Sequence, residues 1–191
     1  MTGDRIPKLT PAELDEEQRA LYDAVAGGPR AQGPQLFRLT DHDGGLEGPF
    51  NAFLLQPRLG QPLQELGAAV RYRTALTDRA REIAILVVAT VHDSGFERYA
   101  HEAVGRHVGL TDEELAGLAD DDVTTLTSPT ERVVATTTRA LTVRGDLDEA
   151  EYAAAVETLG VAGVFELTTL VGYYATLALQ LRVFRVGTPS A

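Results

Sequence analysis

The chain contains no cysteine among its 191 residues. This absence excludes disulfides, thiolate metal sites, iron–sulfur clusters and a cysteine nucleophile. Several short enzyme signatures are also absent: there is no G-x-G-x-x-G, Walker loop, G-x-S-x-G elbow or H-E-x-x-H pair. Nicotinamide-dependent, ATP-dependent, serine-hydrolase and zinc-protease functions therefore lose support.

Basic residues are scarce, with 17 lysines and arginines against 28 acidic residues and a formal net charge of −11. An acidic surface repels phosphate backbones and anionic lipid headgroups. We therefore expect neither a nucleic-acid partner nor a membrane partner.

Long apolar runs are missing as well. The longest uncharged apolar stretch, Leu167–Leu181, falls short of the roughly 18–20 residues that a membrane span needs, and it contains three threonines and a glutamine. We interpret it as a core helix. The first residues, Met1–Thr10, have no apolar segment typical of a signal peptide, so we expect a cytoplasmic protein.

The remaining composition is that of a globular protein, with 44% apolar and 24% charged residues. Its length suits a single domain, and no internal repeat is visible. We predict one domain spanning residues 1–191.

Helix start signals punctuate the chain. Thr10-Pro11-Ala12-Glu13 has the pattern of a capping box, and we expect it to open a helix that carries Leu14, Leu21 and Val25 and ends at Gly27-Gly28-Pro29. Similar boxes begin at Thr111, at Ser128 and at Asp148.

Further helices are expected over residues 59–72, 77–92, 96–108, 131–143, 149–159 and 164–184. The β-branched run Ile83–Ala89 resembles a buried strand, but the element is too long for a typical strand and Thr77-Asp78 is a helix start signal. No hairpin signal stands out. The prediction is an all-α fold of seven or eight helices around one core.

Histidine, the usual acid/base residue near neutral pH, occurs only four times. His101 follows Ser94 and Glu97 at helical spacing, so Glu97 and His101 lie within reach of each other. Glu82 shares a face with apolar residues on the preceding helix, where a carboxylate is costly unless paired. If the two helices pack antiparallel, Glu82 closes a Glu–Glu–His cluster.

Two interpretations of this cluster stay open. Two carboxylates beside an imidazole would raise the pKa of His101 and make it a proton carrier. Alternatively, Glu97 and His101 form an exposed pair worth about 0.2–0.5 kcal/mol, and Glu82 pairs with a nearby arginine. Tyr173, Tyr174, and Tyr72 with its flanking arginines could line a pocket for a carboxylate-bearing substrate, or they could be core aromatics and surface arginines.

The other histidines give weaker signals. His92 would cap its helix, and His107 suits the surface. Asp41-His42-Asp43 is a single short cluster without a second ligand set, so we predict no metal site.

Several segments of this sequence resemble the carboxymuconolactone decarboxylase-like family of the alkylhydroperoxidase D (AhpD)-like superfamily. The matching segments are Gly48–Ala52, Arg81–Leu86, Gly95–Glu102, Gly109–Glu114 and Val171–Tyr174. The resemblance implies an AhpD-like helical fold with a family core over residues 49–186, preceded by an N-terminal helix and loop extension over residues 1–48.

The resemblance also implies roles for individual residues. Peroxidase members carry a glutamate, a C-x-x-C pair and a histidine, which correspond here to Glu82, to Ser94 and Glu97, and to His101. A dithiol peroxidase is excluded, because serine and glutamate cannot cycle through a disulfide. The decarboxylase branch often has a glutamate at the position of Glu97, which implies catalysis by His101, Glu97 and Glu82 without a cofactor.

The same resemblance guides our expectations for binding and assembly. We expect the substrate-binding residues to be Tyr72, Arg73, Ser94, Tyr99 and Tyr173. Members of the family form homo-oligomers, so a trimer or hexamer is expected. Arg182 and Arg185 depart from the family pattern, which has asparagine and an acidic residue near these positions.

Three functions fit these observations. The first is a cofactor-independent lyase or decarboxylase that performs acid/base chemistry on a small carboxylated lactone or keto acid. The second is a pathway-specific isomerase or cyclase of secondary metabolism with a larger substrate, in a wide apolar pocket covered by the loop from Gly27 to Gly48. The third is a non-catalytic ligand-binding homologue, in which a salt bridge occupies Glu82.

Overall fold

Helices dominate the computed structural model, which describes residues 5–28, 31–32 and 34–189. Within those ranges the β pairing is limited to one isolated bridge between Thr40 and Leu46. The elements in chain order are η1 (Pro11–Glu13), α1 (Glu16–Ala26), α2 (Pro49–Phe53), α3 (Pro57–Tyr72), α4 (Asp78–Val91), α5 (Gly95–His107), α6 (Asp112–Ala119), η3 (Val123–Thr125), α7 (Pro129–Arg144) and α8 (Glu149–Phe184). The all-α prediction is confirmed.

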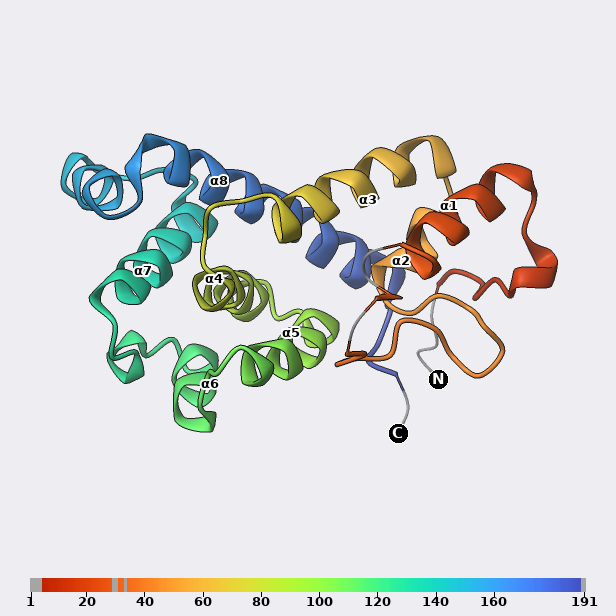
Figure 1. Ribbon diagram of the computed structural model, residues 1–191, viewed down its shortest axis with the longest axis horizontal. Helices are drawn as coiled ribbons and strands as arrows, with labels where there is room; N and C mark the ends of the chain where they lie inside the picture. Colours follow the sequence, from red (N-terminus) through yellow and green to blue (C-terminus); the bar gives the residue numbers. More distant parts are fainter. Residues whose placement is uncertain (1–4, 29–30, 33, 190–191) are drawn as a thin grey trace.

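Helix α4 lies at the centre of the fold, where it contacts α5, α6, α7 and α8 (Figure 1). Every residue from Ala80 to Ala89 is buried. Its β-branched sequence forms a helix because Thr77 caps the first turn by accepting a hydrogen bond from the amide of Ala80. The expected helix over residues 77–92 is therefore confirmed, and a helix buried on all sides explains why its sequence resembles a strand.

The first helix differs from the prediction. The Thr10–Glu13 capping box caps only the short 3₁₀ turn η1, and Leu14 lies outside the helix that follows. Helix α1 begins at Glu16 behind its own box, formed by Asp15 and Gln18, and ends at Ala26. The proposed ending at Pro29 lies outside the described residues.

The later start signals perform largely as expected. Thr111 and Asp148 form reciprocal capping boxes at α6 and α8. Ser128 caps α7 by accepting a hydrogen bond from the amide of Glu131, but the Glu131 side chain binds Arg79 of α4 instead of completing a box. This ion pair fastens α7 to the central helix.

Helix α8 runs along the length of the molecule and is interrupted at Gly160, where φ is 70° (Figure 1). The interruption separates the two helices expected over residues 149–159 and 164–184. By length and composition alone, α8 is apolar enough to cross a membrane, although the core helix of a soluble protein meets the same criterion. Its inward residues, including Leu167, Leu170 and Leu177, belong to the main hydrophobic core.

A loop segment over residues 34–48 connects the α1 region to α2 and is fixed by its own contacts. The Glu47 amide donates to the Leu39 carbonyl at 2.9 Å, and Leu39 and Leu46 are buried in the core. Lys8 forms ion pairs with Asp41 at 3.1 Å and Glu47 at 2.6 Å. These contacts hold the segment against the body of the protein, next to the candidate site.

Candidate active site

Glu82, in the second turn of α4, is only 1% exposed. Its Oε2 lies 2.6 Å from Nδ1 of His101 on α5, and its Oε1 lies 4.0 Å from Nη1 of Arg71 at the end of α3. A buried carboxylate is stable only when charged or hydrogen-bonding partners replace water. Three helices therefore converge on this one side chain.

His101 lies between two carboxylates. Its Nδ1 contacts Glu82, and its Nε2 lies 3.4 Å from Oε2 of Glu97, one turn earlier on α5. Both carboxylates and the imidazole are buried, with exposures of 1%, 3% and 4% for Glu82, Glu97 and His101. The structure thus brings together the three residues that the sequence predicts to form a cluster.

The electrostatics of this cluster favour a charged imidazole. Burial lowers the pKa of His101, but the charge and hydrogen bond of Glu82, together with the contact to Glu97, outweigh it, so that the net shift is above the usual 6.5. Burial raises the pKa of Glu82, yet the His101 and Arg71 charges lower it overall. An imidazolium and a carboxylate are the forms that this geometry stabilises.

Arg71 and Tyr174 complete the surroundings. The Tyr174 ring packs edge-on against the His101 ring, with centroids 5.2 Å apart. Burial raises the pKa of the Tyr174 hydroxyl, so this group stays neutral. Burial opposes the charge on Arg71, but Tyr174 and Glu82 outweigh it and raise the pKa of the guanidinium. Arg71 is therefore a permanent cation beside His101.

Two buried oxygens in this region have no hydrogen-bond partner among the described residues: Oε1 of Glu97 and Oγ of Ser94. Glu97 and His101 line an inner cavity of about 20 Å³, together with Phe37, Arg71 and Tyr173. That volume holds about one water molecule. An unpartnered carboxylate oxygen beside such a cavity is positioned to bind a water molecule or a reacting group.

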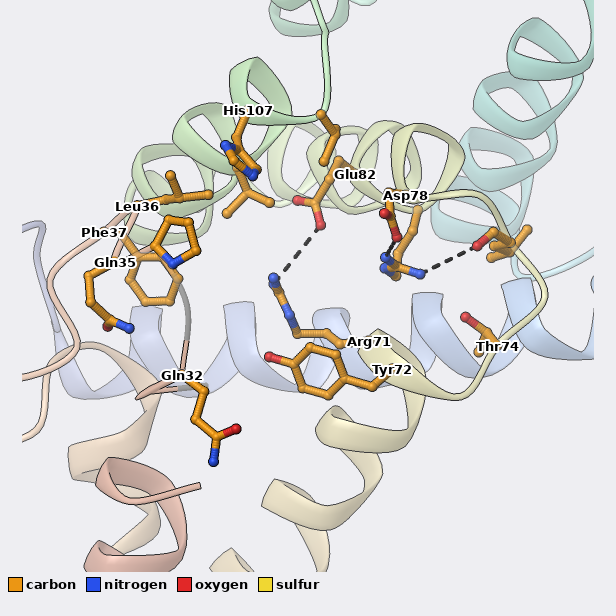
Figure 2. Close-up of a pocket in the computed structure, with 15 residues that line it drawn as sticks. Gln32, Gln35, Leu36, Phe37, Arg71, Tyr72, Thr74, Asp78, Glu82 and His107 are labelled. Carbon is orange, nitrogen blue, oxygen red and sulfur yellow. Dashed lines mark hydrogen bonds and ion pairs between the residues drawn. The ribbon is translucent and has the colours of Figure 1, made fainter. Parts of the chain in front are cut away.

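A larger outer pocket of about 490 Å³ also has Arg71 in its lining (Figure 2). It reaches Glu82 and is bordered by the loop residues Gln32, Gln35 and Phe37. Figure 2 shows Arg71 projecting towards Glu82 from below, with Tyr72 beside it at the pocket wall. The volume suits a small organic ligand.

The predicted binding residues do not all reach these two spaces. Tyr72 lines the outer pocket and Tyr173 lines the inner cavity. Arg73 is exposed and borders neither, while Tyr99 is 39% exposed and packs on Phe96. Ser94 is buried and borders a separate depression that also includes Arg182 and Arg185. Their binding roles stay predictions.

Neither Phe37 nor Arg71 is among the substrate-binding residues that the sequence predicts, although Arg73 is. The signal for Arg71 was available: the buried positions Gly60, Gln64 and Gly67 of α3 continue at helical spacing to residue 71, and not to residue 73. Phe37 lies in an irregular loop, where no periodicity reveals which side chains face inward.

The remaining histidines lie away from the cluster. His42 pairs with Asp43 on the surface at 3.1 Å, and Asp41 pairs with Lys8, so the acidic loop residues take separate partners. His92 is the C-cap of α4 and accepts a hydrogen bond at its carbonyl from Arg182. His107 is exposed at the rim of the outer pocket.

Comparison with known proteins agrees with this fold. The sequence profile of the carboxymuconolactone decarboxylase family matches residues 57–140, which include Glu82, Glu97 and His101. No curated protein matches the chain.

Solved structures share the fold at low identity. An uncharacterized peroxidase-related protein from Ralstonia eutropha JMP134, described as an alkylhydroperoxidase AhpD core, has a TM-score of 0.78 and 13% identity, covering 98% of this chain and 93% of its own. A peroxidase-related protein from Silicibacter sp. TM1040 has a TM-score of 0.74 and 11% identity, with coverages of 98% and 92%. The debrominase Bmp8, in complex with 2,3,4-tribromopyrrole, has a TM-score of 0.70 and 9% identity, with coverages of 98% and 95%.

Structural similarity at such low sequence identity establishes a common fold rather than a common reaction. Residues 57–140 thus match the carboxymuconolactone decarboxylase family, and the chain, which carries no C-x-x-C pair, has an AhpD-like all-helical fold.

Proposed function

We propose that this protein is an acid/base enzyme, a lyase of the decarboxylase type that acts on a small carboxylated lactone or keto acid. The observation that carries the proposal is the position of His101 between two buried carboxylates, one of which keeps an unpartnered oxygen beside a cavity. A purely structural ion pair leaves no buried oxygen unpaired. The unpartnered Oε1 of Glu97 therefore supports a reactive role.

His101 supplies the proton in this proposal. In a decarboxylation the bond between carbon and the carboxylate breaks, CO₂ leaves, and the electron pair passes into the adjacent carbonyl system. The His101 imidazolium then donates its proton to the carbon or the carbonyl oxygen, and solvent restores that proton. Glu82 holds Nδ1 and keeps the pKa of His101 raised, which favours the protonated form that donates.

Glu97 is the second acid/base group. Its Oε2 faces the ring nitrogen of His101 that Glu82 does not hold, and its Oε1 is available to a substrate hydroxyl or a water molecule. Arg71 provides the cation that holds the substrate carboxylate, because guanidinium and carboxylate groups form paired hydrogen bonds. The debrominase Bmp8, which shares this fold, is bound to 2,3,4-tribromopyrrole, and this supports a small ring as the substrate of the present protein.

A second candidate is an isomerase or cyclase that moves a proton on a larger substrate. The size of the outer pocket, about 490 Å³, and its border of loop residues favour it. The same side chains would serve, but no CO₂ would be released. Measurement of CO₂ therefore separates the two candidates.

The test compares the wild-type protein with His101→Asn and Glu97→Gln, using carboxymuconolactone and acetoacetate as substrates and CO₂ release as the readout. We expect each substitution to lower the rate by about 10²–10⁴-fold, the usual contribution of an acid/base group. His42→Asn is the matched control, because His42 is a surface histidine whose side chain is 87% exposed. Its rate should stay within twofold of wild type.

Two results would contradict the proposal. If the wild-type protein releases CO₂ from neither substrate, the decarboxylase assignment is wrong and the isomerase or a ligand-binding role replaces it. If His101→Asn retains the wild-type rate, His101 is not the proton donor.

A further inference from the structure

We infer that Phe37 and Arg71 form a selective boundary between the outer pocket and the inner cavity, and that this boundary admits a small anionic substrate to His101. The substrate class rests on the proposed function. The boundary itself determines which molecules reach the inner cavity, so it can be tested without any turnover.

The boundary follows from the lining of the two spaces. The outer pocket and the inner cavity share two lining residues, Phe37 and Arg71. The outer pocket reaches Glu82 but not His101 or Glu97, whereas the inner cavity reaches His101 and Glu97 but not Glu82. The direct route from the outer pocket to the reactive nitrogen therefore runs past these two side chains.

Phe37 is suited to move by side-chain rotation. It is half-buried and packs against both the main core and the cluster that contains Phe96 and Ala100. Two residues further on, Leu39 is buried and its carbonyl accepts the amide of Glu47. Because this backbone is anchored, rotation of the phenyl ring is the smallest change that joins the two spaces.

Arg71 gives the boundary its charge preference. Its Nη1 lies 4.0 Å from Oε1 of Glu82, beyond the 2.7–3.2 Å range of a hydrogen bond, so this contact is loose. The neighbouring Arg81 of the outer pocket pairs with Asp78. An incoming carboxylate therefore gains most at Arg71, while a neutral molecule gains less.

The volumes indicate how a substrate would lie. An inner cavity of about 20 Å³ admits only a group about the size of a water molecule, whereas about 490 Å³ in the outer pocket accommodates a small organic acid. The substrate would hold its carboxylate at Arg71 and extend one reacting group past Phe37 towards His101. Size selection then acts on the group that enters the cavity, and not on the whole molecule.

The absence of native cysteine makes a direct test possible. Ala100 is 2% exposed and lines the inner cavity, so Ala100→Cys places a single thiol there without altering an ionisable group. Iodoacetate and iodoacetamide alkylate this thiol, forming a sulfur–carbon bond as iodide leaves and the thiol proton passes to solvent. The two reagents have similar size, but only iodoacetate is anionic. Mass spectrometry gives both rates.

In the Ala100→Cys background, we expect Phe37→Ala to raise both alkylation rates at least tenfold. Leu177→Ala is the matched control, because Leu177 is buried and lines the inner cavity but not the outer pocket. It should raise the rates less than threefold. Repeating the measurements in dilute urea identifies alkylation that occurs through global unfolding, since such rates rise with urea in proportion to the unfolded fraction.

Arg71→Gln tests the charge preference. It should lower the ratio of the iodoacetate rate to the iodoacetamide rate at least fivefold. A change in thiol reactivity affects both rates equally and leaves this ratio unchanged. Arg71→Lys keeps the charge and should preserve most of the ratio, and Phe37→Leu is the milder change if Phe37→Ala does not fold. The inference is overturned if the Phe37 variants alkylate no faster than Leu177→Ala, or if the ratio is unchanged without the guanidinium. Either result leaves the CO₂-release test of the proposed function unaffected.

Discussion

The Glu82–His101 pair should contribute a coupling energy that a double-mutant cycle can measure. Breaking a buried ion pair by removing one partner costs about 3–5 kcal/mol. Each partner here keeps a second contact, since Glu97 lies 3.4 Å from His101 and Arg71 lies 4.0 Å from Glu82. We therefore expect losses at or below the lower end of that range, about 3 kcal/mol for Glu82→Gln and about 2 kcal/mol for His101→Gln, with a coupling energy of about 2 kcal/mol at pH 6.

The pKa shifts fix how this energy depends on pH. The lowered pKa of Glu82 contributes stability above its unfolded value of 4.5, and this contribution is lost as the pH falls through the folded value. The raised pKa of His101 contributes stability that is fully present below 6.5 and is lost as the pH rises through the folded value. The coupling energy should thus be largest between about pH 5 and 6.5.

Urea unfolding of the wild type, both single variants and the double variant at pH 6 and pH 10 measures this directly. The account predicts a smaller coupling energy at pH 10 than at pH 6, because the contribution of the raised His101 pKa is lost as the pH rises. A coupling energy below about 0.5 kcal/mol at pH 6, or one that grows towards pH 10, would refute the reasoning.

Two further predictions concern stability and are checked by urea unfolding. At Gly48, φ is +59° and an added Cβ would lie 2.2 Å from the Phe96 ring, so Gly48→Ala should cost more than about 3 kcal/mol. At Gly145 the φ is similar, +72°, but the space around an added Cβ is open, so Gly145→Ala should cost only about 1 kcal/mol. Equal losses for the two variants would show that the contact with Phe96 does not destabilise Gly48→Ala. Arg79 joins α4 to α6 and α7 through two ion pairs, so Arg79→Ala should lower the free energy of unfolding by about 2–3 kcal/mol. Arg139→Ala, which removes an exposed ion pair, should lower it by less than about 1 kcal/mol. Equal losses for the two variants would show that the Arg79 ion pairs stabilise the fold no more than an exposed pair does.

How much of this site the sequence predicts depends on how local each feature is. Glu97 and His101 lie on one helix, so their spacing alone places them together. Glu82 is predictable because a carboxylate on a wholly apolar helix face must find a partner. The identity of that partner depends on the packing of α4 against α5, which the sequence leaves open.

Other features could not be predicted, for different physical reasons. The Thr10–Glu13 box stabilises any first turn, so it does not distinguish the short turn η1 from a long helix. The position of Phe37 depends on tertiary contacts of an irregular loop, and the cavity volumes depend on how side chains pack. The expectations of a single domain, a homo-oligomer and a cytoplasmic location stay predictions.

The pH profile of kcat/KM in Glu82→Gln tests the central claim most directly, with whichever of the two proposed substrates releases CO₂ faster. If His101 is the proton donor and Glu82 raises its pKa, the wild-type rate falls as the pH rises through that raised pKa. In Glu82→Gln the pKa of His101 drops, and the alkaline limb of the profile should move at least about one unit towards lower pH. An alkaline limb that stays at the wild-type pH would show that the titrating group is not His101, and the proposed proton-transfer site would be wrong.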